Sequence, residues 1–501
     1  MGNDYDDALK TIAKGAGIAF VGGIIGQALG FLSRVLIARF LTPNLYGVLS
    51  LALAVFSICV LISLMGIPEG LRRYISYYLG RGSYSKVRGV LVSSIRLTLP
   101  TAIFVSALMF ITSERVSTTL FHNLELSPVL KIFAIGLPFW VLAKIFIEAN
   151  VGFKRVDYKI AAEFIQQVTK ILSVLVFLIA GLGLMGASYG YLLSFFLGPV
   201  IGYYYLKKSL TFDSHYDTVD RELLLYSWPL MLASFSQMIL SWTDTIMLGY
   251  FKTEFEVGIY NAAYPIAQLL TLFGISFAII FLPVITEFYS RRDMENLKRV
   301  YRTTTKWIIT LTFPFFLLVL LFGRWAIYFL FGPEYVSGYN ALSILSVGFF
   351  LNSTFILSRK ILNSIARTKI VMTVSYLSAS ANVILNYLLI PKFGIIGASA
   401  ATSISLAFSS ILSFYMAHNL VEINPFSKKS MLAIAISSVA LLFIYILIKI
   451  IKIELNICLI LLAVVMYVII YFILLVLFKF FDKEDKVIFK AFRDKVGTIL
   501  K

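Results

Sequence analysis

Two stretches of the sequence, Phe40-Leu-Thr-Pro-Asn-Leu-Tyr-Gly-Val48 and Phe251-Lys-Thr-Glu-Phe-Glu-Val-Gly-Ile259, repeat one pattern at a spacing of 211 residues. The turn sequence Gly183-Leu-Met-Gly-Ala-Ser188 returns at the same spacing as Gly394-Ile-Ile-Gly-Ala-Ser399. Between these pairs, Leu97-Thr-Leu-Pro100 returns as Leu311-Thr-Phe-Pro314 at a spacing of 214 residues, which indicates a small insertion. A strongly apolar chain that repeats itself in this way indicates a duplication within a membrane, a pattern typical of transporters.

The composition is that of an integral membrane protein. Of the 501 residues, 59% are hydrophobic and only 14% are charged, so a water-soluble fold would have too much apolar surface to bury. Because a helix needs about 20 apolar residues to cross a bilayer, we predict about 14 transmembrane helices. They fall at residues 17–38, 46–67, 90–111, 130–150, 160–180, 185–206, 228–250, 259–282, 304–330, 338–358, 370–390, 397–417, 431–451 and 456–478.

The repeat divides these helices into two sets of six and one additional pair. We predict an N-lobe at 1–206, a cytoplasmic linker at 207–227, a C-lobe at 228–418, a helix pair at 431–478 and a cytoplasmic amphipathic tail at 479–501. The expected fold class is an all-α integral membrane protein with two parallel six-helix repeats in a two-lobed, exporter-like arrangement. Two repeated bundles that rock about a central site would give alternating access.

The positive charge predicts the orientation of the chain in the membrane. The formal net charge is +18, and about 32 of the 44 Lys and Arg residues fall in the two tails and the even-numbered loops. Positive residues gather on the cytoplasmic side of membrane proteins, so we expect a multi-pass protein of the plasma membrane with both termini in the cytoplasm. This distribution explains the basic charge without a nucleic-acid partner.

The sequence lacks the motifs of a nucleotide-driven or metal-dependent enzyme. It contains no phosphate-binding loop of the Walker A type. The glycines at 181, 183 and 186 match the spacing of a dinucleotide fingerprint, but they lie in a turn between two predicted spans. The histidines and cysteines are scattered and predict neither a metal site nor a disulfide: His122, His215, His418, Cys59 and Cys458. We therefore expect a protein that is not an enzyme and has no cofactor beyond a coupling ion, a proton or sodium.

Charged side chains within the predicted spans are the candidate site residues, because each is costly to place in a bilayer. The first span contains Arg34 and, nearer its outer end, Arg39, which could instead reach the membrane surface. Two further spans contribute Lys144 with Glu148, and Glu163 with Lys170. The spacing of four residues between Lys144 and Glu148 favours an ion pair within one helix. Together these residues predict a polar interior that is basic on balance and suits an anionic substrate.

Asp244 is the candidate of the second half. The spacing of 211 aligns it with Ser33, next to Arg34, so the repeat brings opposite charges to one depth. The carboxylate could form an ion pair with Arg34, bind a proton or sodium ion, or serve as a structural partner. The sequence leaves these three interpretations open.

These residues resemble a known family, the Wzx-type polysaccharide or oligosaccharide flippases of the multidrug, oligosaccharidyl-lipid and polysaccharide exporter superfamily. The likeness covers nearly the whole chain. It is carried by the stretch from Ser33-Arg34 through Ala38-Arg39 to Tyr46-Gly47, by Asp244-Thr-Ile-Met-Leu-Gly249-Tyr, by Gly258-Ile-Tyr260-Asn261-Ala-Ala, and by the Gly-x-x-Gly-Ala turns.

The resemblance implies two six-helix lobes around a V-shaped cavity and an additional helix pair associated with lipid handling. It also implies the substrate, a glycan joined through phosphate or pyrophosphate to a long polyprenol. Arg34, and less directly Arg39, would meet the phosphate, and Lys144 and Lys170 would add positive field. The implied partners are membrane lipids, the lipid-linked glycan, and a polymerase or glycosyltransferase of the same synthesis.

Three other classes remain as alternatives. A cation-coupled multidrug exporter shares the fold, but it usually has twelve helices and carboxylates in its first lobe. A flippase for the lipid-linked peptidoglycan precursor has fourteen helices and arginines in its cavity, so only its substrate separates it. A membrane glycosyltransferase would need a large extramembrane loop or a metal-binding acidic pair, and the longest loops here have about 20 residues.

Overall fold

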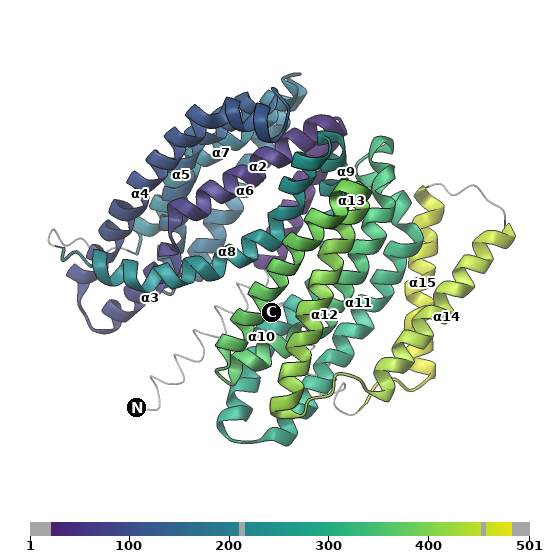
Figure 1. The fold of residues 1–501 in the computed structure, drawn as a ribbon. Coiled ribbons are helices and arrows are strands. Elements are labelled where there is room, and N and C mark those ends of the chain that lie inside the picture. Colours follow the sequence, from purple (N-terminus) through teal and green to yellow (C-terminus); the bar gives the residue numbers. More distant parts are fainter. Residues whose placement is uncertain (1–21, 210–215, 452–456, 483–501) are drawn as a thin grey trace. The chain divides into compact units, whose positions relative to one another are not determined.

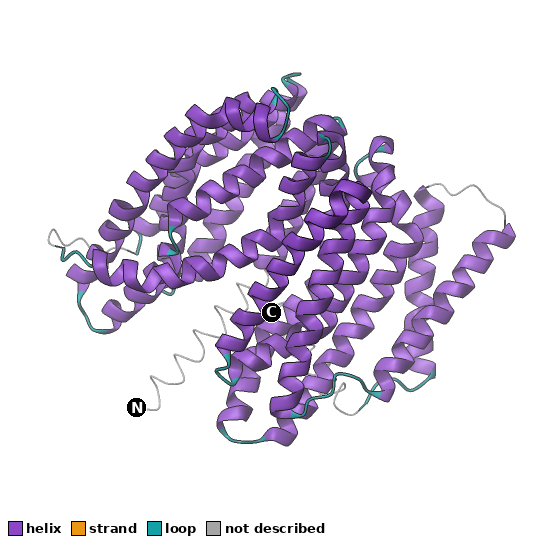
Figure 2. Ribbon diagram, in the orientation of Figure 1, coloured by secondary structure: helices purple, strands orange, loops and turns teal. Residues whose placement is uncertain are grey.

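The computed structural model describes residues 22–209, 216–451 and 457–482, and these residues form helices joined by turns and short loops, without strands (Figure 2). The first described helix is Gly22–Phe40. The others are α2 (Pro43–Leu64), α3 (Ile67–Gly80), α4 (Tyr84–Arg115), α5 (Leu126–Gly152), α6 (Val156–Ile179), α7 (Gly183–Lys207), α8 (Asp220–Phe251), α9 (Glu254–Gln268), α10 (Thr271–Ser290), α11 (Met294–Leu330), α12 (Tyr339–Ser364), α13 (Thr368–Val421), α14 (Lys428–Ile451) and α15 (Ile457–Leu477), with short turns of π-helix at Val116–Leu120 and 3-10 helix at Pro333–Gly338.

The helices agree with the predicted membrane class. Among the described residues, 12 helices are long and apolar enough to cross a membrane, and α9 with α10, bent by 46°, brings the number to 13. The element α13 covers two of the predicted spans, 370–390 and 397–417, and consists of two helices joined across a kink at Gly394, so the two spans are counted once among the 12. The tail predicted at 479–501 and the start of the first span lie largely outside the described residues.

A glycine breaks α13 between its two predicted spans. Gly394 has φ +54° and ψ −130°, which is not helical, and the left-handed region costs a residue with a side chain about 1–2 kcal/mol. The amide of the next residue, Ile395, donates to Oε2 of Glu256 at 3.1 Å. A methyl group on Gly394 would overlap that carboxylate. The break therefore requires glycine both for its φ and for the close approach of Glu256.

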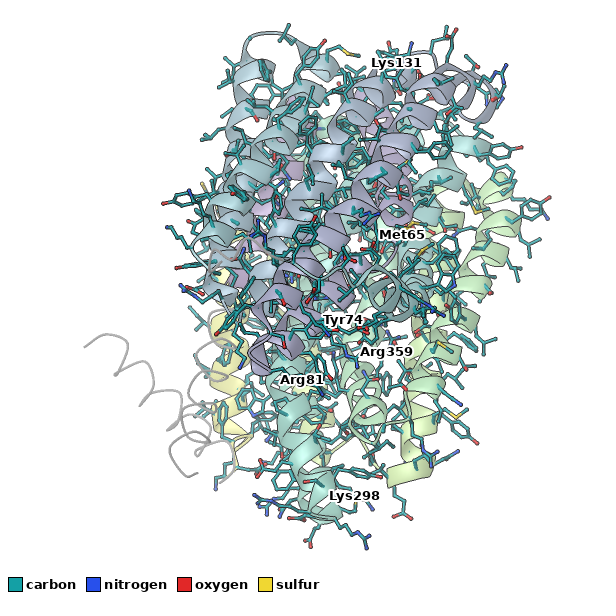
Figure 3. All side chains as sticks on the ribbon, turned by 90° about the vertical axis from the view of Figure 1, so that its left-hand side faces the viewer. Met65, Tyr74, Arg81, Lys131, Lys298 and Arg359 are labelled. Atoms are coloured by element: carbon teal, nitrogen blue, oxygen red, sulfur yellow. The ribbon has the colours of Figure 1, made fainter. Side chains whose placement is uncertain are left out.

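Helix α3 lies almost entirely between the predicted spans 46–67 and 90–111, where no helix was predicted from the sequence. Met65 and Gly66 both have positive φ, at 47° and 71°, and they separate α2 from α3. Beyond this break, Pro68 suits the first turn of a new helix, where its missing N–H has no role. In Figure 3, Met65 lies between Lys131, near the top of the view, and Arg81, lower down.

Helix α3 is short and amphipathic, which explains why a search for long apolar runs misses it. Its apolar residues follow a helical spacing and are buried, whereas its arginines lie on the other side. The buried residues are Ile67, Leu71, Ile75 and Tyr78.

The described helices group into two compact units that are not divided at one point of the sequence (Figure 1). Unit 1 comprises the chain up to Pro265 with Leu330–Gly338 and Ala379–Thr402. Unit 2 comprises Ile266–Phe329, Tyr339–Ser378 and the chain from Ser403. The lobe boundaries at 1–206 and 228–418 stay predictions from the sequence.

Small residues let the helices of unit 1 approach closely. Along α7 a small residue recurs every four positions, so that one face of the helix has almost no side chain. A methyl group on Gly190 would lie 2.6 Å from the Cα atom of Val174 in α6, and one on Gly198 would lie 2.9 Å from Cβ of Ala143 in α5. The row consists of Gly186, Gly190, Ser194, Gly198 and Gly202.

Unit 2 holds the additional helix pair against α11. Phe322 of α11 packs in one buried cluster with Ala440 of α14 and Tyr467 of α15. Near the other end of the pair, the hydroxyl of Tyr471 donates to the carbonyl of Thr310 at 2.9 Å. The pair is thus fixed to α11 by both apolar packing and a buried hydrogen bond.

Candidate functional site

Unit 1 contains a cavity of about 790 Å³ between the helix Gly22–Phe40, α2, α5, α6 and α7. One wall is aromatic, with the ring of Phe56 stacked on that of Phe195 at 5.0 Å between centroids. Helix α6 contributes polar side chains to the lining, beside the apolar Ile160, Ala161 and Phe164. The polar side chains are Asp157, Glu163, Gln166, Gln167 and Lys170. The cavity is large enough for a sugar-sized group and has both apolar and charged surface.

Lys170 is the cation among the described residues that line this cavity. Glu163 and Lys170 are two turns apart on α6 and both line the cavity, as the spacing predicted. The ammonium group of Lys170 lies 5.3 Å from the centre of the Tyr191 ring and forms no ion pair with a described residue. A cation without an acidic partner in a cavity keeps its charge available for an anion.

Arg34 lies near Lys170 and is also without an acidic partner. Its side chain is accessible and forms no ion pair or hydrogen bond with the described residues. One turn before Arg34, a methyl group on Gly30 would lie 3.5 Å from the side-chain amide nitrogen of Gln167, which precedes Lys170 by three residues on α6. The two cations therefore produce one positive region in unit 1, although Arg34 does not itself line the cavity of 790 Å³.

Arg39 lies at the end of the same helix, and its side chain contacts the main chain near Leu330. Its Nε donates to the main-chain carbonyl of Leu330 at 3.0 Å, and its side chain is exposed. It does not line the cavity. This position agrees with the interpretation that Arg39 reaches the membrane surface rather than the substrate path.

Lys144 and Glu148 belong to a charge network, and the predicted ion pair between them is confirmed at 2.8 Å. Glu148 is only 3% exposed and also faces Lys159 at 3.0 Å and Arg72 at 3.5 Å. Glu163 lies 3.8 Å from both lysines. The network joins α3, α5 and α6, and Glu148 offsets the positive field that Lys144 was expected to supply.

Asp244 lies in α8 and is 3% exposed, surrounded by neutral groups. Its Oδ1 accepts hydrogen bonds from Asn386 at 2.6 Å and from Asn382 at 3.5 Å. Its Oδ2 accepts short hydrogen bonds from the hydroxyl groups of Tyr260 and Thr402. No described cation forms an ion pair with it, so the pairing of Asp244 with Arg34 is absent from this structure.

One atom of this cluster lacks a partner. Oδ1 of Asn386 is buried and accepts no hydrogen bond from the described residues. A carboxylate, amide oxygens and a hydroxyl are the hard oxygen donors that bind small cations. The cluster therefore offers a buried negative charge and a free oxygen atom at one place.

Sequence reasoning found the charged members of these sites and missed their neutral partners. Asn382 and Asn386 lie one turn apart in an apolar span. This pair could have predicted a buried polar cluster, because buried amides in membrane helices need hydrogen-bond partners. Lys159 was missed because it lies in the first turn of α6, just before the apolar run begins.

The comparisons with known proteins agree with this architecture. Residues 12–289 match the family described as polysaccharide biosynthesis protein, and residues 229–388 match the MatE family. An uncharacterized membrane protein of Methanocaldococcus jannaschii is 27% identical over 90% of this chain and 93% of its own length. The probable low-salt glycan biosynthesis flippase Agl15 of Haloferax volcanii is 24% identical over 81% of this chain and 83% of its own.

Solved structures share the fold. The lipid II flippase MurJ, in an inward closed conformation, superposes with a TM-score of 0.75 at 17% identity and covers 92% of this chain and 98% of its own. An inward-facing multidrug resistance transporter of the MATE family superposes with a TM-score of 0.68 at 18% identity, over 79% of this chain and 94% of its own. Because the first family match covers more than half of the sequence, this chain belongs to the polysaccharide biosynthesis protein family, within the multidrug, oligosaccharidyl-lipid and polysaccharide exporter superfamily.

Proposed function

We propose that this protein is a flippase that moves a polyprenyl-phosphate- or pyrophosphate-linked oligosaccharide from the cytoplasmic to the outer leaflet during synthesis of a surface glycan. Its relatives include the Haloferax glycan biosynthesis flippase and a putative O-antigen transporter of Shigella flexneri. The observation that carries the proposal is the cavity of about 790 Å³ whose cation Lys170 has no acidic partner, with Arg34 nearby.

The physical argument concerns the two parts of such a substrate. A glycan cannot cross hydrocarbon unaided, because each unsatisfied polar group costs several kcal/mol. The polar side chains of α6 offer amide, carboxylate and ammonium groups to the sugars, while the polyprenol can stay in the bilayer. Lys170 and Arg34 attract the phosphate. Lys144, Glu148 and Glu163 connect helices α5 and α6 through their ion pairs, and Arg39 lies outside the cavity at the end of the first helix.

We propose that Asp244 binds the coupling cation, sodium or a proton. A buried carboxylate with only neutral partners favours a bound cation, since charge burial is otherwise costly. Thr402 and the free Oδ1 of Asn386 would complete the oxygen shell. Exchange of this ion between the two sides of the membrane would supply the energy that the chain does not obtain from nucleotide.

We further propose a plasma-membrane orientation with both termini in the cytoplasm, and synthesis enzymes of the glycan as partners. The two alternatives in the same superfamily differ in their substrate. A peptidoglycan-precursor flippase would turn over a lipid-linked muropeptide, whereas a multidrug exporter would move small organic cations that two free cations repel.

The test is leaflet turnover of a fluorescent polyprenyl-pyrophosphate oligosaccharide in proteoliposomes, with and without a sodium or pH gradient. We expect turnover by the wild type and its loss in Arg34→Ala and Lys170→Ala, with unfolding temperatures unchanged. Lys207→Ala, an exposed lysine at the end of α7, serves as the matched control and should keep full activity. Full activity of both cavity variants would remove these residues from the site, and gradient-driven export of organic cations alone would overturn the flippase assignment.

A further inference from the structure

Unit 2 contains a second cavity, of about 490 Å³, where α11 and α14 begin and α15 ends. None of its residues belongs to the sites described above. They are Glu295, Lys298, Arg299, Arg302, Thr303, Lys306, Ser427, Lys429 and Asp482.

The lining is strongly cationic for a geometric reason. On α11, Lys298, Arg302 and Lys306 follow one another at steps of four residues, which places them on one face of the helix. Lys429 in the first turn of α14 adds a fourth neighbouring cation, and Arg299 a fifth. The carboxylates near them are fewer: Glu295 and Asp482 line the cavity, and Glu422 forms an ion pair with Lys298 at 2.9 Å. The cavity thus has an excess of positive charge that attracts an anion.

A carboxylate of the protein itself, that of Asp482, already lies between two lysines of the cavity. The carboxylate of Asp482 lies 3.4 Å from the ammonium group of Lys306 through Oδ2, and 3.4 Å from that of Lys429 through Oδ1. Lys306 is 4% exposed, so its charge is held at a fixed place. Phe480, which is fully buried, packs against Trp307 at 6.3 Å and anchors the segment that carries Asp482. The basic side chains are therefore held in fixed positions around a cavity and do not lie on a flat surface.

The position of the cavity relative to the apolar parts of the helices indicates the source of the anion. The long apolar part of α11 begins at Trp307, directly after Lys306, and the apolar parts of α14 and α15 lie on the same side of the cavity. Trp residues concentrate at the boundary between hydrocarbon and headgroups. Figure 3 shows Lys298 at the end of unit 2. The cations thus lie where the phosphates of membrane lipids lie, and on the side where Lys and Arg gather in the sequence.

We propose that this cavity binds the phosphate headgroup of an anionic phospholipid from the surrounding leaflet. Basic pockets between transmembrane helices on the cytoplasmic side bind such headgroups. The first turn of α14 contains no acidic residue, and Ser427 accepts a hydrogen bond from the amide of Ser430 at 3.0 Å, so this helix end adds to the positive potential. The site is independent of the transported substrate.

Native mass spectrometry of the full-length protein in detergent tests the proposal, with phosphatidylglycerol, phosphatidylcholine or inorganic phosphate added. We expect a bound phosphatidylglycerol, and binding weakened about tenfold or more in the double variant Arg302→Gln with Lys429→Gln. Lys428→Gln is the matched control, because this neighbouring lysine is exposed and does not line the cavity.

Three results would overturn the site. They are equal binding of phosphatidylcholine, undiminished phosphatidylglycerol binding in the double variant, and binding of inorganic phosphate that displaces the lipid completely, which would assign the cavity to a soluble phosphate. Thermal unfolding of each variant checks its fold. If the double variant unfolds, the single variant at Arg302, whose side chain is exposed, carries the same test with a smaller expected loss.

Discussion

Gly47 and Gly258 each face the main chain of the other's helix: a methyl group on Gly47 would overlap the carbonyl oxygen of Glu254, and one on Gly258 would overlap that of Pro43. Pro43 and Glu254 are the first residues of α2 and α9. All four positions obey the spacing of 211 residues found in the sequence. The contact is thus reciprocal, as a two-fold relationship between repeated helices requires.

This contact predicts that Gly47→Ala and Gly258→Ala destabilise the protein by similar amounts, about 1–3 kcal/mol each, because the added methyl has no room. Thermal unfolding in detergent measures the effect. Gly80→Ala is the control, since nothing lies within 4 Å of a methyl group there. Unequal losses for the two glycines, or equal losses for all three variants, would contradict the reciprocal contact.

The break in α13 gives a second prediction. Gly394→Ala should cost more stability than Gly183→Ala, although both glycines have nearly the same φ, +54° and +51°. Only Gly394 also meets a neighbour, the carboxylate of Glu256, while Gly183 has open space around it. The positive φ is common to both, at about 1–2 kcal/mol, and the ψ of −130° at Gly394 lies outside the left-handed helical region and adds to its strain. The difference in unfolding temperature reports this ψ together with the Glu256 contact, and identical losses would contradict the prediction.

The buried Glu148 gives a third prediction. Glu148→Gln leaves Arg72, Lys144 and Lys159 clustered without their shared carboxylate, and removal of one partner from a buried network costs about 3 kcal/mol. Glu163→Gln is the control within the same network, because its side chain is 43% exposed and its loss should cost less than about 1 kcal/mol. Comparable losses in urea unfolding would show that Glu148 is not the centre of the network.

The Asp244 cluster gives a fourth prediction, which needs no transport assay. A cation bound to the folded state raises the unfolding temperature with its concentration, by mass action. We expect such a rise with sodium, or with proton concentration if the proton is the ion, in the wild type and not in Asp244→Asn. Glu287→Gln, which removes an exposed carboxylate, should respond as the wild type does. A response that persists in Asp244→Asn would place the ion elsewhere.

The apolar runs were sufficient to predict the class of fold. Helix existence depends on local composition, and the described residues of the predicted spans are helical apart from short breaks such as those at 65–66 and 269–270. Helix α3 was missed because its apolar residues recur only once per turn, so no continuous run marks it. The break at Gly394 was visible as a glycine turn, but the carboxylate that holds it comes from Glu256, which is 139 residues from Ile395, whose amide it binds.

The candidate sites show the same limit. Charges in spans were conspicuous because a bilayer makes each of them costly, so Arg34, Lys170 and Asp244 were recognised. Their surroundings depend on distant chain segments. Asn386 and Thr402 lie 142 and 158 residues from the carboxylate that they bind, and no local pattern connects them to it. The sequence therefore indicated where charge is buried and left open what neutralises it.

The absence of acidic partners around Lys170 and Arg34 makes the proposed cycle sensitive to voltage. The carboxylates in the lining, Asp157 and Glu163, lie beside cations of their own at 2.8 and 3.8 Å, so the empty site keeps the two positive charges of Lys170 and Arg34. A bound pyrophosphate brings these two charges close to neutral. Moving one elementary charge through 100 mV is worth about 2.3 kcal/mol. An inside-negative potential would therefore draw the empty site back toward the cytoplasm and leave the loaded step almost unaffected. The membrane potential would then drive the return of the empty transporter and not the movement of the loaded substrate.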